Sequence, residues 1–157
     1  MRMLGVLLLV CAFGATAAAS IDVPIDVRAQ AKAAKKVVVA TISDIEGSRL
    51  DVNEHGDQVI ITKAWLHADE TLKGDFQEVL AVEVEGGTVG DLTLKVSDMP
   101  VLKKGDRAVF FLNPNRAGAN SLSGRARGML KLDSNDRVAN GALTLADVKA
   151  RVREAGR

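Results

Sequence analysis

Residues 60–68 read Ile-Ile-Thr-Lys-Ala-Trp-Leu-His-Ala, and this stretch decides the class of fold. The side chains alternate between two faces, the first with Ile60, Thr62, Ala64, Leu66 and Ala68, the second with Ile61, Lys63, Trp65, His67 and Asp69. Successive side chains of a β-strand point to opposite sides, so this period of two predicts a long strand with one face turned inward. The turn sequence Lys73-Gly74-Asp75 ends the strand.

Shorter segments of the same kind lie on both sides of this strand. They are apolar or alternating runs separated by turn residues, at positions 37–45, 79–85, 92–96, 108–112 and 129–132. The run at 108–112 is nearly all apolar, so we expect it to be buried on both sides. The polar residues 46–57 predict a loop or an exposed hairpin, and the Gly-, Ala-, Asn- and Ser-rich segment after Pro114 predicts a loop.

The carboxyl end changes to a helical period. Thr144 can cap a helix, with Asp147 three residues later in the place that a capping box uses. The stripe that follows is apolar at helical spacing and consists of Leu145, Val148, Val152 and Ala155. About six strands and one such helix predict a mainly β protein, a small antiparallel barrel with a C-terminal amphipathic helix packed on it.

The first nineteen residues have the pattern of a signal peptide. Arg2 is followed by a ten-residue apolar run that is too short to cross a bilayer as a helix, and then by alternating alanines. Cleavage is expected after Ala17 or Ala19, and in the second case Ser20 begins the mature chain. The expected organisation is a signal peptide at 1–19, an N-terminal arm at 20–35 and a barrel domain at 36–157. This predicts a periplasmic or secreted protein with no membrane span after cleavage.

Composition excludes several classes of function. The chain has 157 residues, of which 47% are hydrophobic, 3% are aromatic and one is cysteine, which fits one domain without a disulfide framework. The only cysteine is Cys11, inside the signal peptide. Removal of the signal peptide takes away Arg2, so 20 basic residues then balance 20 acidic ones. A chain without net charge and with few aromatic residues is not typical of nucleic-acid binding.

The order of strands and turns resembles that of a group of uncharacterised exported bacterial proteins. The matching segments are KKVVVATI at 35–42, TLKGD at 71–75, VEVEGG at 82–87, PVLKKGD at 100–106 and VFFL at 109–112. More distantly, residues 34–132 are similar to the barrel of the tissue inhibitors of metalloproteinases and netrin-like domains. The resemblance implies an OB-like barrel and, as a partner, an exported protease or another envelope protein.

The same resemblance points to the mature amino terminus. In the metalloproteinase inhibitors, an amino-terminal cysteine presents its amine and carbonyl to the zinc of the protease, and disulfides hold that end in place. Ser20 would take this position here, and the processed chain has no cysteine to anchor it. An arm without an anchor loses the preorganisation that makes such binding tight.

Four further residues are candidate binding residues. Trp65 lies on the polar face of the 60–68 strand, where it is either an interface anchor or is covered by the C-terminal helix or the arm. His67 shares that face with Asp69, and it is either a solvated strand residue or an imidazole beside that carboxylate. Arg125 and Arg127 belong, with Arg116 and Lys131, to the one local basic cluster, which either solvates a loop or contacts an acidic protein surface.

These observations favour an exported, non-enzymatic protein-binding module, possessing no catalytic residues, no metal site and no cofactor. With only two histidines, a nucleophile, a base and an orienting group do not fall together in the sequence. The alternatives are a small exported hydrolase and a structural component of an envelope assembly.

Overall fold

The two longest strands form one bent hairpin that makes much of the barrel wall. The computed structural model describes residues 25–53, 55–139 and 141–157, and it places strands at β1 (Lys36–Val52) and β2 (Gln58–Lys73). The inner face of β2 is the predicted one, since Ile60, Ala64 and Leu66 are buried. Four shifts of register along β1 and β2 bend the pair, as β-bulges do. The polar segment 46–57 is therefore the exposed end of a hairpin, one of the two forms expected for it.

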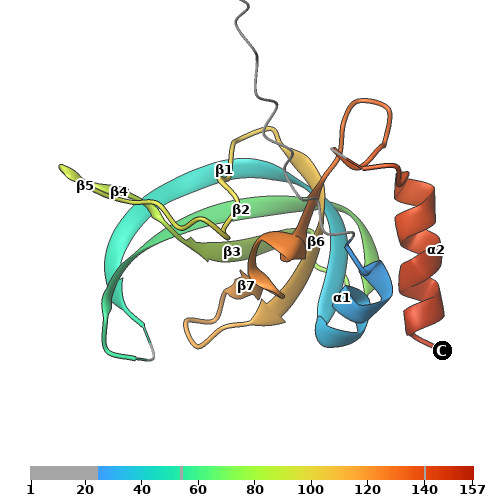
Figure 1. Cartoon of the computed structure of the whole chain (residues 1–157), viewed down its shortest axis with the longest axis horizontal. Coiled ribbons are helices and arrows are strands. Elements are labelled where there is room, and N and C mark those ends of the chain that lie inside the picture. The colour runs from blue at the N-terminus through green and yellow to red at the C-terminus, as the bar shows by residue number, and fades with distance from the viewer. Residues whose placement is uncertain (1–24, 54, 140) are drawn as a thin grey trace, which may run out of the picture.

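Three more strands close the barrel (Figure 1). They are β3 (Val79–Glu85), β6 (Arg107–Pro114) and β7 (Asn120–Leu122). β1 pairs with β2 along one edge and with β6 along the other, and β7 joins β6 to β3, so the order β1-β2-β3-β7-β6 returns to β1. The mainly β, OB-like barrel with a C-terminal helix is confirmed. Its joint between β3 and β7 is one short parallel pairing, whereas an antiparallel barrel was expected, and β7 lies where the sequence predicted only a loop.

Residues of β6 are shared between two hydrophobic clusters. Ala108, Phe110 and Leu112 point into the barrel, whereas Val109 and Phe111 point outward to the helices. All five are buried, so the prediction that this strand is covered on both sides is confirmed. The barrel interior and the layer beneath the helices are thus two cores on opposite faces of one sheet.

Two helices cover the outer face of β1 and β6. The first, α1 (Val27–Ala33), begins at Asp26, whose side chain accepts hydrogen bonds from two backbone N–H groups of its first turn. The second, α2 (Leu145–Ala155), begins at Thr144 with the predicted capping box. The two helices lie side by side in Figure 1. Neither they nor the other described residues contain a helix that is long and apolar enough to span a membrane.

The barrel and α1 are joined by a lysine. Lys73, the last residue of β2, places its Nζ 2.6 Å from the carbonyl oxygens of both Ala31 and Ala34. These carbonyls belong to the C-terminal end of α1, where backbone oxygens lack partners within the helix and the helix dipole favours a cation. Part of the expected N-terminal arm at 20–35 is therefore a helix that is fixed onto the barrel.

A second, small sheet projects from the barrel on the left of Figure 1. It consists of β4 (Gly87–Val89) and β5 (Leu92–Leu94). At its base, a Cβ at Gly87 would lie 2.3 Å from the hydroxyl oxygens of both Ser48 and Thr62, so only glycine fits there. A 3₁₀ turn, η1 (Arg125–Gly128), and a short strand, β8 (Met129–Lys131), complete the elements.

The amino-terminal predictions fall outside this description. The signal peptide at 1–19, Ser20 and the first part of the arm precede Ile25, the first described residue.

Candidate functional site

The outer face of β2 and β3 carries the side chains that define the site. Alternation along both strands turns the residues between the buried ones outward, and the register sets Lys63 opposite Glu83 and Trp65 opposite Ala81. These cross-strand pairs are the sheet's direct side-chain neighbours. The outer end of β1 continues the same face with polar residues, and the β6–β7 loop, residues 115–119, closes its other side.

A groove runs along this face. Its volume is about 630 Å³, and its walls come from the end of β1, from β2 and β3, from the β6–β7 loop and from η1. We call it the sheet-face groove. Its charged lining residues are Arg49, Asp51, Glu83, Glu85, Arg116 and Arg125.

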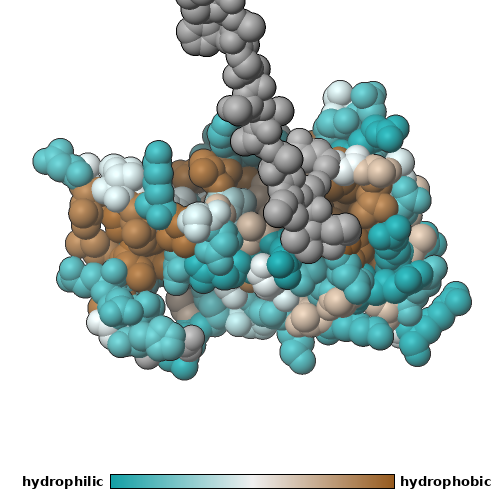
Figure 2. Space-filling model, viewed as in Figure 1, coloured by the Kyte–Doolittle hydropathy of each residue, from teal (hydrophilic) through white to brown (hydrophobic). Residues whose placement is uncertain are grey.

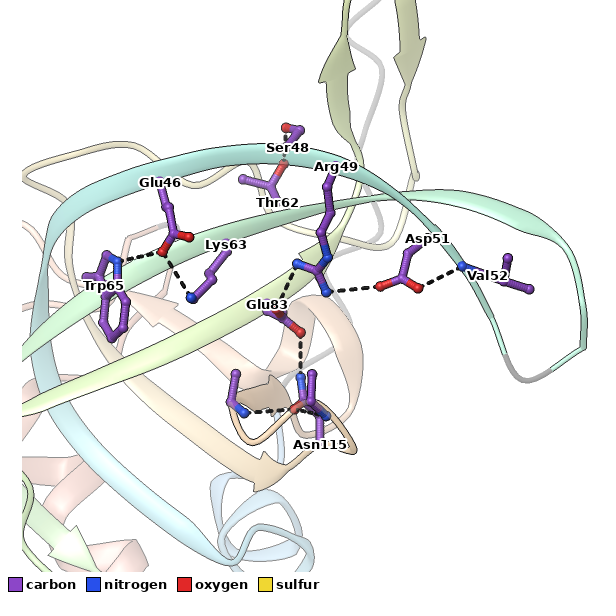
Figure 3. Close-up of polar contacts among 12 residues, drawn as sticks. Glu46, Ser48, Arg49, Asp51, Val52, Thr62, Lys63, Trp65, Glu83 and Asn115 are labelled. Carbon is purple, nitrogen blue, oxygen red and sulfur yellow. Dashed lines mark hydrogen bonds and ion pairs between the residues drawn. The ribbon is translucent and has the colours of Figure 1, made fainter.

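Glu83 is the centre of the polar contacts in the groove (Figure 3). Its side chain is only 10% exposed; one oxygen accepts from Arg49 Nη1 at 2.8 Å and the other from Asn115 Nδ2 at 2.7 Å. Arg49 also contacts Asp51 at 2.9 Å. The hydrogen bond to Glu83 raises the pKa of the Arg49 guanidinium above its ordinary value. The groove wall is thus a hydrogen-bonded set of side chains that already have partners.

Trp65 is held in one orientation beside the groove. Its Nε1 donates to Glu46 Oε2 at 3.0 Å, and the same oxygen lies 3.0 Å from Lys63 Nζ, which sits 4.6 Å from the centre of the indole ring (Figure 3). The hydrogen bond from Lys63 lowers the pKa of Glu46, so the carboxylate stays ionised and keeps both partners. Trp65 is therefore a half-buried aromatic residue with a fixed ring.

A second hollow of about 290 Å³ adjoins Trp65, and we call it the Trp65 hollow. Its other lining residues include Val79 and Ala81 of β3 and Ala117 and Gly118 of the β6–β7 loop. Glu83 and Ala117 line both this hollow and the sheet-face groove, so the two hollows adjoin each other. The stripe of α2 packs elsewhere, against Val109 and Phe111. The C-terminal helix is therefore not what covers Trp65, and the role of this residue as an interface anchor stays a prediction.

Arg125 stands at the other end of the groove. It contacts Asp98 at 2.5 Å through Nε and Glu85 at 3.1 Å through Nη2, and the hydrogen bond to Asp98 raises its pKa. Its backbone φ is 60°, a value that L-residues seldom adopt outside turns and functional sites. Two carboxylates from different segments therefore fix this guanidinium at the rim.

The structure brings together only part of the predicted set. Trp65 lines the Trp65 hollow and Arg125 lines the adjoining sheet-face groove, whereas His67 and Arg127 are exposed residues outside both linings. His67 is exposed, as a solvated strand residue would be, and the carboxylate of Asp69 contacts Arg107 at 3.2 Å. The basic cluster is divided as well, since Lys131 pairs with Asp106 at 2.7 Å.

Sequence reasoning missed several residues that build the site. Arg49 lies in the segment 46–57, which was expected to be either a loop or an exposed hairpin, so the direction of its side chain could not be predicted. Asn115 lies in the loop predicted after Pro114. Glu83 was placed on the outer face by alternation, yet its contact with Arg49 depends on a register that sequence does not give. A charge pattern could have pointed to Glu83, because Lys63 and Glu83 lie on the outward faces of two strands that follow each other in the sequence, and opposite charges often face each other across neighbouring strands.

The part of the chain that the structure describes contains no group of three or more His, Cys, Asp or Glu residues that could hold a metal ion. The groove instead offers fixed guanidinium, carboxylate and amide groups beside an indole ring. No model of a known protein family matches the chain, and no curated protein matches it. The class that the fold defines is an OB-like barrel, a fold whose second and third strands and adjoining loops commonly bind oligonucleotides or oligosaccharides.

Proposed function

We propose that this protein is an exported, non-enzymatic binding module that holds a segment of another exported protein in the sheet-face groove. The observation that carries the proposal is the fixed Trp65 ring beside a preformed hollow. A large aromatic side chain that is already oriented loses little entropy when a partner packs on it, which is why tryptophan is frequent among interface hot spots.

The charges of the groove support a polypeptide as the ligand. Three arginines and three carboxylates line it, namely Arg49, Arg116 and Arg125 with Asp51, Glu83 and Glu85. Their formal charges cancel, so the groove has no excess of positive charge to attract a polyanion. A peptide segment with both polar and apolar side chains matches such a surface, since interfaces combine an apolar anchor with a polar rim.

The contacts of the acidic residues support binding over catalysis. A general acid or base needs a proton that it can exchange with a substrate. The Glu83 carboxylate accepts from Arg49 and Asn115, and Glu85 lies 3.1 Å from Arg125. Both are therefore used to organise the surface.

The class of partner follows from the signal-like sequence and from the resemblance to protease inhibitors. An exported protease or another envelope protein is the partner that these two features favour. Direct coordination of a protease zinc by the amine of Ser20 is a separate prediction, because Ser20 lies outside the described residues. Stoichiometric inhibition of an exported metalloprotease that is abolished by one extra residue before Ser20 would support it.

Photo-crosslinking tests the groove directly. A photoreactive amino acid at Ala117, an exposed loop residue that lines both hollows, would be compared with one at Lys32, an exposed residue of α1. The full chain is expressed with its leader, so that cells process it. We expect one exported protein to crosslink at Ala117 and not at Lys32.

Affinity for that captured protein then tests the role of Trp65. Trp65→Ala should weaken binding roughly 30-fold or more, the loss typical of a hot spot. Val101→Ala is the control, because Val101 is 78% exposed and lines a different hollow. Equal affinity of Trp65→Ala and the unmodified protein would overturn the proposal, and catalytic turnover of the captured protein would favour the hydrolase alternative.

A further inference from the structure

The small β4–β5 sheet has an edge that faces no other strand. β5 pairs in register with β4 alone among the described strands, and Leu92 is 56% exposed. An isolated two-stranded sheet is marginally stable in water, and an exposed edge is a template for pairing with another chain. This hairpin therefore has an open edge, and a further strand paired with that edge would stabilise it.

The pairing within the hairpin fixes which backbone groups the open edge presents. Val89 and Leu92 face each other across a two-residue turn, and Thr88 and Thr93 form the next pair. In a hairpin with a two-residue turn the pair that closes the turn is hydrogen-bonded, here Val89 and Leu92, and the two kinds of pair alternate along the ladder. Thr88 and Thr93 therefore form a non-hydrogen-bonded pair, whose side chains lie closer. Their hydroxyl oxygens are indeed 3.0 Å apart. The N–H and C=O of Thr93 consequently point away from β4.

The sequence of this edge is complementary to itself. Residues 91–95 read Asp-Leu-Thr-Leu-Lys. If two copies pair antiparallel about Thr93, Asp91 of one copy faces Lys95 of the other, and Leu92 faces Leu94. Asp91 and Lys95 are both exposed, and neither forms an ion pair with another described residue.

We infer that two copies of this chain associate through β5 to form one four-stranded sheet. The Thr93 backbones exchange hydrogen bonds on the two-fold axis, and an Asp91–Lys95 pair forms on each side of it. Leu92 and Leu94 of both copies pack on one face of the new sheet. This interface is separate from the sheet-face groove and does not depend on the proposed function.

The surface beside β5 supports an occupant that brings apolar side chains. Figure 2 shows hydrophobic residues on the same side of the molecule as the projecting hairpin. A hollow of about 760 Å³ lies there, with Leu94, Val96 and the 78% exposed Val101 among its lining residues. The formal net charge of the chain is only +1, so two copies repel each other weakly.

Charge reversal tests the proposed register. By sedimentation equilibrium, we expect a dimer whose dissociation constant rises about tenfold in Asp91→Lys and in Lys95→Asp, because each change places like charges opposite each other. The double variant Asp91→Lys/Lys95→Asp should regain the original dissociation constant. An equimolar mixture of the two single variants should form a mixed dimer. A protein that stays monomeric up to about 1 mM would overturn the inference, as would a dimer that neither single variant weakens.

A cysteine on the two-fold axis tests the geometry. Directly opposed residues of a hydrogen-bonded pair have Cα atoms about 5.5 Å apart, within the range of a disulfide. In a Cys11→Ala background, Thr93→Cys should give a covalent dimer on oxidation. Thr88→Cys, on the same face of the same hairpin but on β4, should not. Equal crosslinking of the two variants would refute the register even if the protein is a dimer.

Discussion

Gly128 lies so close to its neighbours that the methyl group of an alanine side chain should not fit there without a change in the structure. It is the last residue of η1 and is buried. A Cβ at this position would lie 2.6 Å from the backbone oxygen and 3.0 Å from the backbone nitrogen of Ser123, and 2.9 Å from Cβ of Leu122. These atoms belong to or directly follow β7, the strand that closes the barrel. Gly128→Ala can therefore be accommodated only if the backbone moves.

The expected cost of Gly128→Ala follows from two opposing effects. Overpacking of a buried site costs about 1–3 kcal/mol. Replacing glycine also reduces the conformational freedom of the unfolded chain, which stabilises the folded state by about 0.4–1 kcal/mol. Gly141→Ala has only the second effect, since its Cβ would meet its nearest atoms at 3.7 Å, and neither glycine has a left-handed φ. The unfolded-state effect is common to both variants, so Gly128→Ala should be less stable than Gly141→Ala by the overpacking cost alone, roughly 1–3 kcal/mol.

Urea unfolding at one protein concentration measures this difference, provided the slope m stays constant across the variants. A shift of η1 should also disturb Arg125, so partner binding should weaken in Gly128→Ala and stay unchanged in Gly141→Ala. A difference in unfolding free energy below about 0.5 kcal/mol, the size of an ordinary surface substitution, would show that this close approach of Gly128 to Ser123 does not exist in solution.

Three more predictions concern individual contacts. Lys73→Met should lower the free energy of unfolding by about 1–2 kcal/mol in urea titrations, because two carbonyls at the end of α1 lose their donor. Hydrogen bonds from Thr144 lower the pKa of Asp147, so their stabilisation is present above the ordinary pKa and is lost as the pH falls through the lowered one. Between neutral pH and about pH 3, Asp147→Asn should therefore lose less stability than the unmodified protein, and parallel thermal melts would contradict this. A double-mutant cycle on Arg49→Met and Glu83→Gln should give a coupling of about 0.5–1 kcal/mol, because Arg49 is 43% exposed; a coupling of zero would count against the contact.

Local patterns predicted the elements whose burial is periodic. The alternation at 60–68 placed Ile60, Ala64 and Leu66 inside, and the cap at Thr144 placed the start of α2. In both cases a repeated apolar spacing or a single side-chain contact fixes the structure within a few residues. Such signals need no knowledge of the rest of the chain.

The elements that sequence missed depend on distant partners. β7 consists of Asn120, Ser121 and Leu122, which have no strong strand preference, and the strand exists because β3 and β6 lie on both sides of it. The candidate site shows the same division. Trp65 was singled out by its chemistry, whereas the contact between Arg49 and Glu83 arises from three strands in a register that no local pattern specifies.

The pairing of Val37 with Phe111 sets the moment at which the barrel can be completed. A chain that emerges amino terminus first, from a ribosome or a translocation channel, can form the β1–β2 hairpin early. It cannot join β1 to β6 until Phe111 has emerged, and β7 must follow before the ring is closed. Contacts so far apart in sequence form slowly. For most of its synthesis the chain would therefore present a partly formed barrel, with the β6-facing edge of β1 unpaired, to any chaperone that binds it.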